Sequence, residues 1–292
     1  MRGKTALITG GASGIGRAIG EAMAERGATL VLADRQLELA EEVAAAICGG
    51  GGKAEAIELD VRDASAFVSL AKDIKERHGS IDYFFNNAGI GVGGEVSDYD
   101  RAAWDDVLDV NVRGVAYGVS AVYPIMVQQG SGHIVNTASM AGLMPGPGMA
   151  SYTASKHAVV GLSKGLRVEA ARHGVRVSAL CPGAIRTPIL TGGRYGRSVG
   201  RQLAEDKMAE LWERVRPMNV DAFALEVLKD VERDEPFIIV PRWWKAMWAV
   251  QRLSPKLGLW LMARAHARTI AHVEAHGVPA QEPPIPGPKV HA

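Results

Sequence analysis

The chain has 292 residues, which is enough for one large α/β domain whose core needs no disulfide or metal for stability. Hydrophobic residues make up 47% and charged residues 22%, with a net charge of +1, so the composition lacks the basic excess of nucleic-acid-binding proteins. Its two cysteines do not suggest a disulfide framework, and no uncharged apolar run reaches the roughly 18 residues of a membrane-spanning helix. We therefore expect a cytoplasmic protein.

Short apolar runs alternate with longer amphipathic stretches along the first 240 residues. The runs predict buried strands at 5–10, 28–34, 53–61, 81–89, 132–139, 175–183 and 236–241. The stretches between them predict helices at 15–26, 36–48, 63–78, 100–128, 152–172 and 221–231. Such alternation indicates a doubly wound parallel sheet of about seven strands with helices on both faces. We expect residues 1–240 to form a single catalytic domain.

The first predicted strand leads into a glycine-rich sequence, TGGASGIG at 9–16, which opens the first helix. Gly10, Gly14 and Gly16 permit a tight turn and a close approach to a pyrophosphate, which the helix N-terminus attracts. The spacing differs from the commoner dinucleotide motif, and a plain glycine-rich turn is the alternative. Asp34 ends the second strand, where a carboxylate can bind an adenosine ribose, cap the next helix, or do both.

The charges around this sequence favour one of the two nicotinamide cofactors. The carboxylate of Asp34 repels the 2′-phosphate of NADP, so we predict NAD, with NADP the alternative. Arg35 can offset part of that repulsion, whereas Ser13 brings no positive charge to the glycine loop.

The sequence SYTASK, at 151–156, places Tyr152 and Lys156 on one face of a helix. A lysine charge about 5 Å from a phenol contributes roughly 3 kcal/mol at an effective dielectric constant of about 20, or about 2 pKa units. This predicts a tyrosine with a pKa low enough for general acid–base catalysis. Ser139 ends the fifth strand, at the sheet edge where ligands bind, and is either a hydrogen-bond donor to a substrate oxygen or a turn residue.

Seven motifs, taken in order, resemble those of the short-chain dehydrogenase/reductase family. They are TGGASGIG, DV (60–61), NNAG (86–89), VNVRG (110–114), Ser139, YTASK (152–156) and PGAIRTP (182–188). The resemblance covers about residues 4–190 and implies a Rossmann-like fold. It implies that Tyr152 is the acid–base and that Lys156 lowers its pKa and binds the nicotinamide ribose. It further implies that Ser139 polarises the substrate carbonyl and that Asn111 holds a water in a relay to Lys156.

The same resemblance extends the expected cofactor site. Asp60 and Val61 would contact adenine, 87–89 would line the cofactor floor, and Ile185 and Thr187 would hold the carboxamide. With the glycine loop and the end of the second strand, the expected cofactor contacts are Gly10, Ser13, Gly14, Ile15, Gly16, Asp34, Arg35, Asp60, Val61, Asn87, Ala88, Gly89, Tyr152, Lys156, Pro182, Gly183, Ile185 and Thr187.

These features predict an NAD-dependent oxidoreductase that interconverts a secondary alcohol and a ketone. Leu143, Met144 and Met149 lie between the serine and the tyrosine, so we expect an apolar pocket wall and a steroid, terpenoid or long-chain substrate. Residues 189–202 have the composition of a mobile lid. The alternatives are an NADPH-dependent β-ketoacyl thioester reductase, whose acyl carrier could meet Arg194, Arg197 and Arg201, and a non-catalytic cofactor sensor or membrane-surface module.

The C-terminal region departs from the family pattern, because it lacks the usual Gly-Gly segment. Residues 241–276 carry four tryptophans and six basic residues against one acid, Glu274, and predict an amphipathic helical extension. It could pack on the domain or across a homo-oligomer, a dimer or tetramer; lie on an anionic membrane; or roof the pocket. His272 and His276 lack a third ligand, so no metal site is expected. The Pro-rich end, 277–292, is expected to be disordered.

Overall fold

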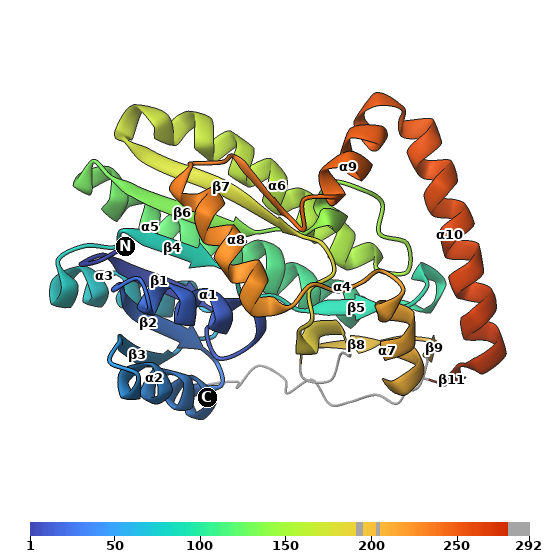
Figure 1. Ribbon diagram of the computed structural model, residues 1–292, viewed down its shortest axis with the longest axis horizontal. Coiled ribbons are helices and arrows are strands. Elements are labelled where there is room, and N and C mark those ends of the chain that lie inside the picture. The colour runs from blue at the N-terminus through green and yellow to red at the C-terminus, as the bar shows by residue number, and fades with distance from the viewer. Residues whose placement is uncertain (191–194, 203–204, 280–292) are drawn as a thin grey trace.

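A seven-stranded parallel sheet forms the centre of the computed structural model, which describes residues 1–190, 195–202 and 205–279 (Figure 1). In spatial order the strands are β10 (Phe237–Val240), β7 (Val175–Pro182), β6 (Gly132–Thr137), β4 (Tyr83–Asn86), β1 (Thr5–Thr9), β2 (Thr29–Asp34) and β3 (Lys53–Glu58). Each lies within one of the seven apolar runs, so the predicted strands and fold class are confirmed. The strand order reverses beside β1, which pairs with β2 on one side and β4 on the other. In such sheets ligands bind at this point, beyond the carboxyl ends of the strands.

Helices cover both faces of the sheet. One face carries α1 (Gly14–Ala24), α2 (Leu37–Gly49) and α8 (Val220–Glu232), and the other carries α3 (Ala64–His78), α5 (Gly114–Gln129) and α6 (Ala150–Ala170). Successive residues of β1 point to opposite faces, so Ile8 packs in the cluster with α1 and α8, and Leu7 packs with α3 and α5. Both are fully buried, and burial of such a side chain contributes about 1.5–3 kcal/mol.

The predicted helix at 100–128 is interrupted. The structure has α4 (Arg101–Leu108), a π-helical turn at Asp109–Arg113, and then α5. Asn111 lies inside the π-helical turn, and its side chain is hydrogen-bonded to the main chain of Ile90. A single π-helical turn within a longer helix is a frequent feature of functional sites.

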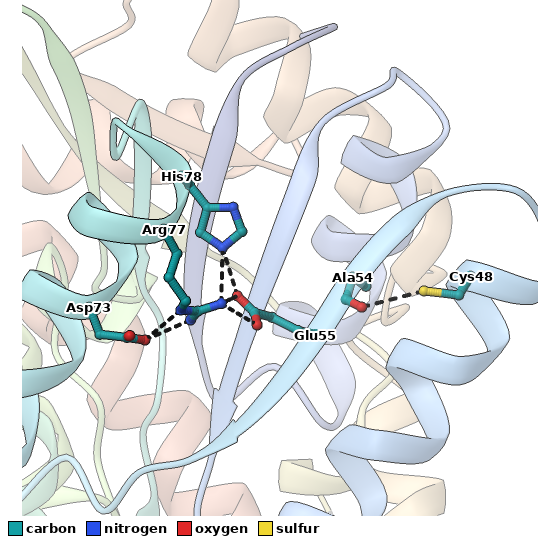
Figure 2. Close-up of polar contacts among 6 residues, drawn as sticks. All are labelled: Cys48, Ala54, Glu55, Asp73, Arg77 and His78. Atoms are coloured by element: carbon teal, nitrogen blue, oxygen red, sulfur yellow. Dashed lines mark hydrogen bonds and ion pairs between the residues drawn. The ribbon is translucent and has the colours of Figure 1, made fainter.

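A charged cluster lies on β3, at the edge of the sheet (Figure 2). Arg77 of α3 donates to Glu55 of β3 at 2.7 Å and to Asp73 at 2.7 Å, and His78 Nε2 lies 2.8 Å from Glu55. Burial raises the pKa of Glu55, but the hydrogen bonds from Arg77 and His78 outweigh it and lower that pKa overall. Charged side chains along an edge strand also disfavour pairing with a further chain.

Two small sheets connect distant parts of the chain. Strand β5 (Gly91–Gly93) pairs with β8 (Gly196–Ser198), and β9 (Arg201–Gln202) pairs with β11 (Val278–Pro279). The predicted lid at 189–202 thus contributes two of these strands, while 191–194, with Arg194, lie outside the described residues, as does the side chain of Arg201. Arg197 donates to Asp100 at 2.6 Å and its side chain is 10% exposed, so it is not available to an acyl carrier.

The C-terminal region forms a helical hairpin of α9 (Trp244–Leu253) and α10 (Pro255–His276). Ser254 caps α10 by accepting a hydrogen bond from the Leu257 amide at 3.3 Å, and Pro255 occupies the first turn. Of the predicted tail, residues 278 and 279 form β11, and 280–292 lie outside the described residues. No helix in the described ranges is long and apolar enough to cross a membrane.

Candidate active site

The glycine loop after β1 is closely packed. Gly10 and Gly14 adopt φ angles of +66° and +52°, which favour glycine. A Cβ atom on Gly16 would lie 2.1 Å from the Gly10 carbonyl oxygen, so only glycine fits there. Ser13 precedes α1, but its hydroxyl makes no capping hydrogen bond within the described part of the chain. The first amides of α1, next to Ile15, therefore fit a pyrophosphate group.

Asp34 links this loop to the end of β2 by a hydrogen bond. Its carboxylate accepts hydrogen bonds from the Ala12 amide at 3.1 Å and the Gln36 amide at 3.0 Å, and the residue is buried. Gln36, not Asp34, is the N-cap residue of α2, so the helix-cap interpretation of Asp34 is wrong. The neighbouring Arg35 is exposed. A buried carboxylate held at the end of β2 fits a ribose whose hydroxyls donate to it.

Asp60 and Val61 follow β3 at the same edge of the sheet. Arg62 Nε donates to both carboxylate oxygens of Asp60, at 2.9 and 3.0 Å. Burial raises the pKa of Asp60, but the hydrogen bonds from Arg62 outweigh it, so the pKa lies below its usual value. Val61 is buried against Gly114, where a Cβ atom would lie 2.8 Å from Val61 Cγ2. The site therefore has an apolar surface next to an ionised carboxylate.

Residues 87–89, after β4, are bound to the end of β1 through Thr9. The Thr9 hydroxyl accepts from the amides of Asn87 at 2.9 Å and Ala88 at 3.1 Å, and Asn87 Nδ2 donates to the Thr9 carbonyl at 3.1 Å. Sequence reasoning missed Thr9, although a threonine that ends a central strand was a possible signal. The expected cofactor floor thus meets the glycine loop.

The residues after β7 approach the same loop. Thr187 donates to the Ile185 carbonyl at 3.3 Å, and its Cβ lies 3.5 Å from where a Cβ atom of Gly14 would be. Ile185 is buried and bridges to Met218. The structure therefore brings Thr187 to the N-terminus of α1, the position predicted for the pyrophosphate.

Trp244 of the C-terminal hairpin covers the end of β7, a contact that sequence reasoning missed. A Cβ atom on Gly183, which follows Pro182, would lie 2.0 Å from the indole Nε1 of Trp244. That nitrogen is buried and has no hydrogen-bond partner within the part of the chain that the structure describes. The tryptophan-rich composition of 241–276 signalled packing, but not this partner.

Lys156 lies buried beside Tyr152, as the spacing predicts. Its Nζ donates to the Thr137 carbonyl at 2.9 Å and lies 5.4 Å from the centroid of the Tyr152 ring. Gly89 leaves room for this side chain, since a Cβ atom there would lie 3.3 Å from Nζ. Burial lowers the pKa of Lys156 to about 8, because the interior disfavours the charged ammonium.

The pKa of Tyr152 shifts opposite to the predicted direction. Burial raises the pKa of the phenol, and hydrogen bonding from Ser139 lowers it only in part. The lowering that we predicted from Lys156 is not found, because the ammonium is directed at the Thr137 carbonyl and its own charge is disfavoured by burial. The structure does bring Ser139 to the phenol, and the same hydroxyl accepts from the Ala141 amide at 3.1 Å. Both predicted roles of Ser139 are thus compatible.

Asn111 is fully buried and its side chain is occupied by protein groups. Its Oδ1 accepts from the Ile90 amide at 2.9 Å, while Nδ2 donates to the Ile90 carbonyl at 2.9 Å and to Ser155 Oγ at 3.1 Å. A water relay through Asn111, as the family resemblance implies, would therefore use its main-chain carbonyl. The π-helical turn around Asn111 alters the local main-chain bonding that such a role needs.

The apolar surroundings of Tyr152 come from other residues than the sequence suggested. Tyr152 packs against a buried cluster that contains Val92 and Val199, so the β5–β8 pair lies beside Tyr152. Of the expected wall residues, Leu143 and Met144 pack instead in the cluster with Val160 and α9, while Met149 precedes α6 as its N-cap residue.

The depressed pKa of Lys156 predicts a pH-dependent stability. An unfolded lysine has a pKa of 10.5, so between about pH 8 and 10.5 the unfolded chain binds more protons than the folded one. The stability of the wild type should therefore rise with pH across this window, relative to Lys156→Met, by up to roughly 3 kcal/mol. Urea denaturation at several pH values measures the difference. Lys164→Met, at an exposed position of α6, is the control. Its free energy of unfolding should change with pH as that of the wild type does.

The fold and the site together define a nucleotide-dependent oxidoreductase, and comparisons with known proteins agree. A family model described as short chain dehydrogenase matches residues 4–196. The oxidoreductase UcpA of Escherichia coli (strain K12) is 40% identical over 234 residues, covering 78% of this chain and 85% of that protein. Levodione reductase of Leifsonia aquatica is 42% identical over 190 residues, covering 64% and 71%.

Solved structures give the same assignment. A short chain dehydrogenase/reductase from Burkholderia phymatum in complex with NAD aligns with a TM-score of 0.78 at 32% identity, covering 88% of this chain and 95% of that one. One from Sphingobium yanoikuyae in complex with NADPH aligns with a TM-score of 0.71 at 29% identity, covering 85% and 93%. The chain belongs to the short-chain dehydrogenase/reductase family of NAD(P)-binding oxidoreductases.

Proposed function

We propose that this protein is an NAD-dependent dehydrogenase that interconverts an apolar secondary alcohol and its ketone. The observation that carries the proposal is the grouping of Tyr152, Ser139 and Lys156 at the sheet edge that also holds the glycine loop. An acid–base group, a hydrogen-bond donor and a lysine at one position match the requirements of carbonyl–carbinol chemistry.

Tyr152, Ser139 and Lys156 would each have a different role at the substrate oxygen. When bound, the nicotinamide cofactor supplies the hydride acceptor for oxidation or the hydride donor for reduction. During oxidation Tyr152 removes the proton of the substrate hydroxyl, and during reduction it returns a proton to the same oxygen. Ser139 donates a hydrogen bond to that oxygen, which stabilises the negative charge that develops there. Lys156, anchored on the Thr137 carbonyl, supplies positive charge close to the phenol.

Asp34 supports NAD as the cofactor. Its buried carboxylate is held by two main-chain amides, so it cannot turn away from a 2′-phosphate. Moving a phosphate next to a carboxylate in a partly buried site costs several kcal/mol at an effective dielectric constant of about 20. Arg35 is exposed beside it, so solvent screens its charge and it offsets only part of this repulsion.

The surroundings of Tyr152 support an apolar substrate. Beyond Ser139 and Lys156, Tyr152 packs against a hydrophobic cluster that contains Val92 and Val199. The charged residue of β8, Arg197, is paired with Asp100. The similarity to a levodione reductase is in keeping with a ketone of this kind.

A cofactor and substrate comparison tests the proposal. The wild type should form NADH from cyclic or long-chain secondary alcohols with a kcat/KM at least about tenfold above that for hydroxy acids, and should prefer NAD over NADP by a similar factor. Asp34→Asn removes the charge at nearly constant volume and should raise the NADP-to-NAD ratio of kcat/KM by about 10- to 100-fold.

The control uses the neighbouring cation. Adding Arg35→Gln to Asp34→Asn should reverse part of the gain in NADP use, because the cation next to position 34 is then removed. An unchanged ratio in Asp34→Asn, or a wild type that prefers NADPH, would contradict the cofactor assignment. Activity confined to hydroxy acids would contradict the substrate assignment.

A further inference from the structure

The outer face of the C-terminal hairpin is apolar and exposed. Leu253 is 87% exposed and Trp260 is 53% exposed, and Leu257 and Leu261 are exposed beside them. Leu257, Trp260 and Leu261 are spaced to lie on one side of α10, as are Arg264 and Arg268. We call the set Leu253, Leu257, Trp260, Leu261, Lys256, Arg264 and Arg268 the hairpin face.

The opposite side of the hairpin is already used for packing. Met262 of α10 packs against the cluster that contains Val160 and Ile239, and next to it Met262 and His266 line an apolar groove with Pro145, Pro147 and Thr153. Trp244 and Trp248 of α9 pack in the cluster that contains Val160 and Ile239. The hairpin is therefore fixed to the domain by one side, and the hairpin face points away from it.

The hairpin face carries positive charge that no acid neutralises. Within the described ranges Lys256, Arg264 and Arg268 have no carboxylate within 4 Å, and Glu274 is the one acid in 241–276. The Arg264 guanidinium lies 4.9 Å from the Trp260 ring centroid. A tryptophan with an arginine over its ring combines an apolar body with a charged end, which suits the boundary between lipid chains and headgroups.

We propose that the hairpin face docks on an anionic lipid membrane. Leucine and tryptophan side chains would enter the headgroup region, while the basic side chains meet lipid phosphates and carboxylates. A second copy of this chain fits less well, since a two-fold interface brings each patch against itself. Lys256, Arg264 and Arg268 of two copies would then face one another without an acid to separate them.

The place of the hairpin suits this role. Figure 1 shows α10 at the end of the molecule toward which β7 runs. α10 also contacts β9, and β5 packs with Tyr152. Docking would therefore bring the active-site end of the sheet close to the membrane. The binding itself does not depend on the reaction that the enzyme catalyses.

Vesicle sedimentation of the full-length protein tests the proposal. Binding to phosphatidylcholine vesicles with about one-third phosphatidylserine should exceed binding to pure phosphatidylcholine, and salt should weaken it. Each basic residue near such a surface contributes about fivefold, so Lys256→Gln/Arg264→Gln should weaken binding by about 30-fold. Trp260→Ala/Leu261→Ser should weaken it at least about tenfold at low salt as well.

A charge-matched control shows whether vesicle binding depends on the hairpin face or only on the net charge of the protein. Lys53→Gln/Lys72→Gln removes two exposed lysines from β3 and α3 and should leave vesicle binding within about twofold of the wild type. Thermal unfolding and NADH binding show that each variant is folded. Equal binding to both vesicle types, or equal losses in the hairpin and control variants, would overturn the proposal. The proposal would also be overturned if the wild type bound no vesicles and formed a dimer that the hairpin variants convert to monomer.

Discussion

Tyr152→Phe is expected to lower kcat/KM for alcohol oxidation by roughly 10²- to 10⁴-fold, the range that a positioned acid–base group contributes. The change removes only the phenolic oxygen, the group that we propose exchanges a proton with the substrate oxygen. Tyr152 packs against the cluster that contains Val92 and Val199, and phenylalanine keeps the aromatic ring. The variant should therefore fold and bind NADH with a dissociation constant within about twofold of the wild type.

Steady-state kinetics and NADH fluorescence titration measure the two effects separately. Tyr123→Phe, which makes the same chemical change on α5 where the ring contacts His173, is the matched control and should keep full activity. If Tyr152→Phe turned over within a few-fold of the wild type, another group would have to transfer the proton. Loss of NADH binding together with activity would instead indicate a structural role for the phenol.

Much of the fold follows from patterns that are local in the sequence. Strands such as β1 and β7 are buried on both faces, so they appear as largely apolar runs next to a glycine. The accessory pair β5–β8 could not be predicted in this way. Gly91–Gly93 and Gly196–Ser198 are three residues each and are joined by contacts between distant segments, which no local period signals.

The sequence predicted which candidate residues lie close together, but it did not predict the directions of their pKa shifts. Spacing placed Tyr152 and Lys156 together, and strand ends placed Ser139 and Asp34 at the ligand edge. The pKa directions depend on burial, and a sequence does not give the depth at which an ammonium lies or the carbonyl that it faces. For Lys156 that partner is Thr137, a residue without a motif of its own. The contact of Trp244 with Gly183 joins the C-terminal hairpin to β7 and is likewise non-local.

The glycine loop gives the second large expected effect. Gly16→Ala should raise the dissociation constant of NADH by about 100-fold, because overpacking of a rigid site costs about 1–3 kcal/mol. The new methyl group would lie 2.1 Å from the Gly10 carbonyl oxygen and 2.7 Å from Asn87 Nδ2. Neither can yield easily, since Gly10 has a φ of +66° and Asn87 Nδ2 donates to the Thr9 carbonyl at 3.1 Å. The loop would have to shift away from the N-terminus of α1.

A second glycine-to-alanine change controls for the general effect of this substitution on the chain. Gly49 is the last residue of α2, and an added Cβ atom there would meet nothing within 4 Å, so Gly49→Ala should bind NADH like the wild type. Fluorescence titration with NADH gives the dissociation constants, and thermal unfolding shows whether each variant is folded. A folded Gly16→Ala that bound NADH within a few-fold of the wild type would mean that the cofactor does not approach the main chain of this loop. The pyrophosphate would then have to bind elsewhere, and the loop that follows β1 could not be the cofactor-binding loop.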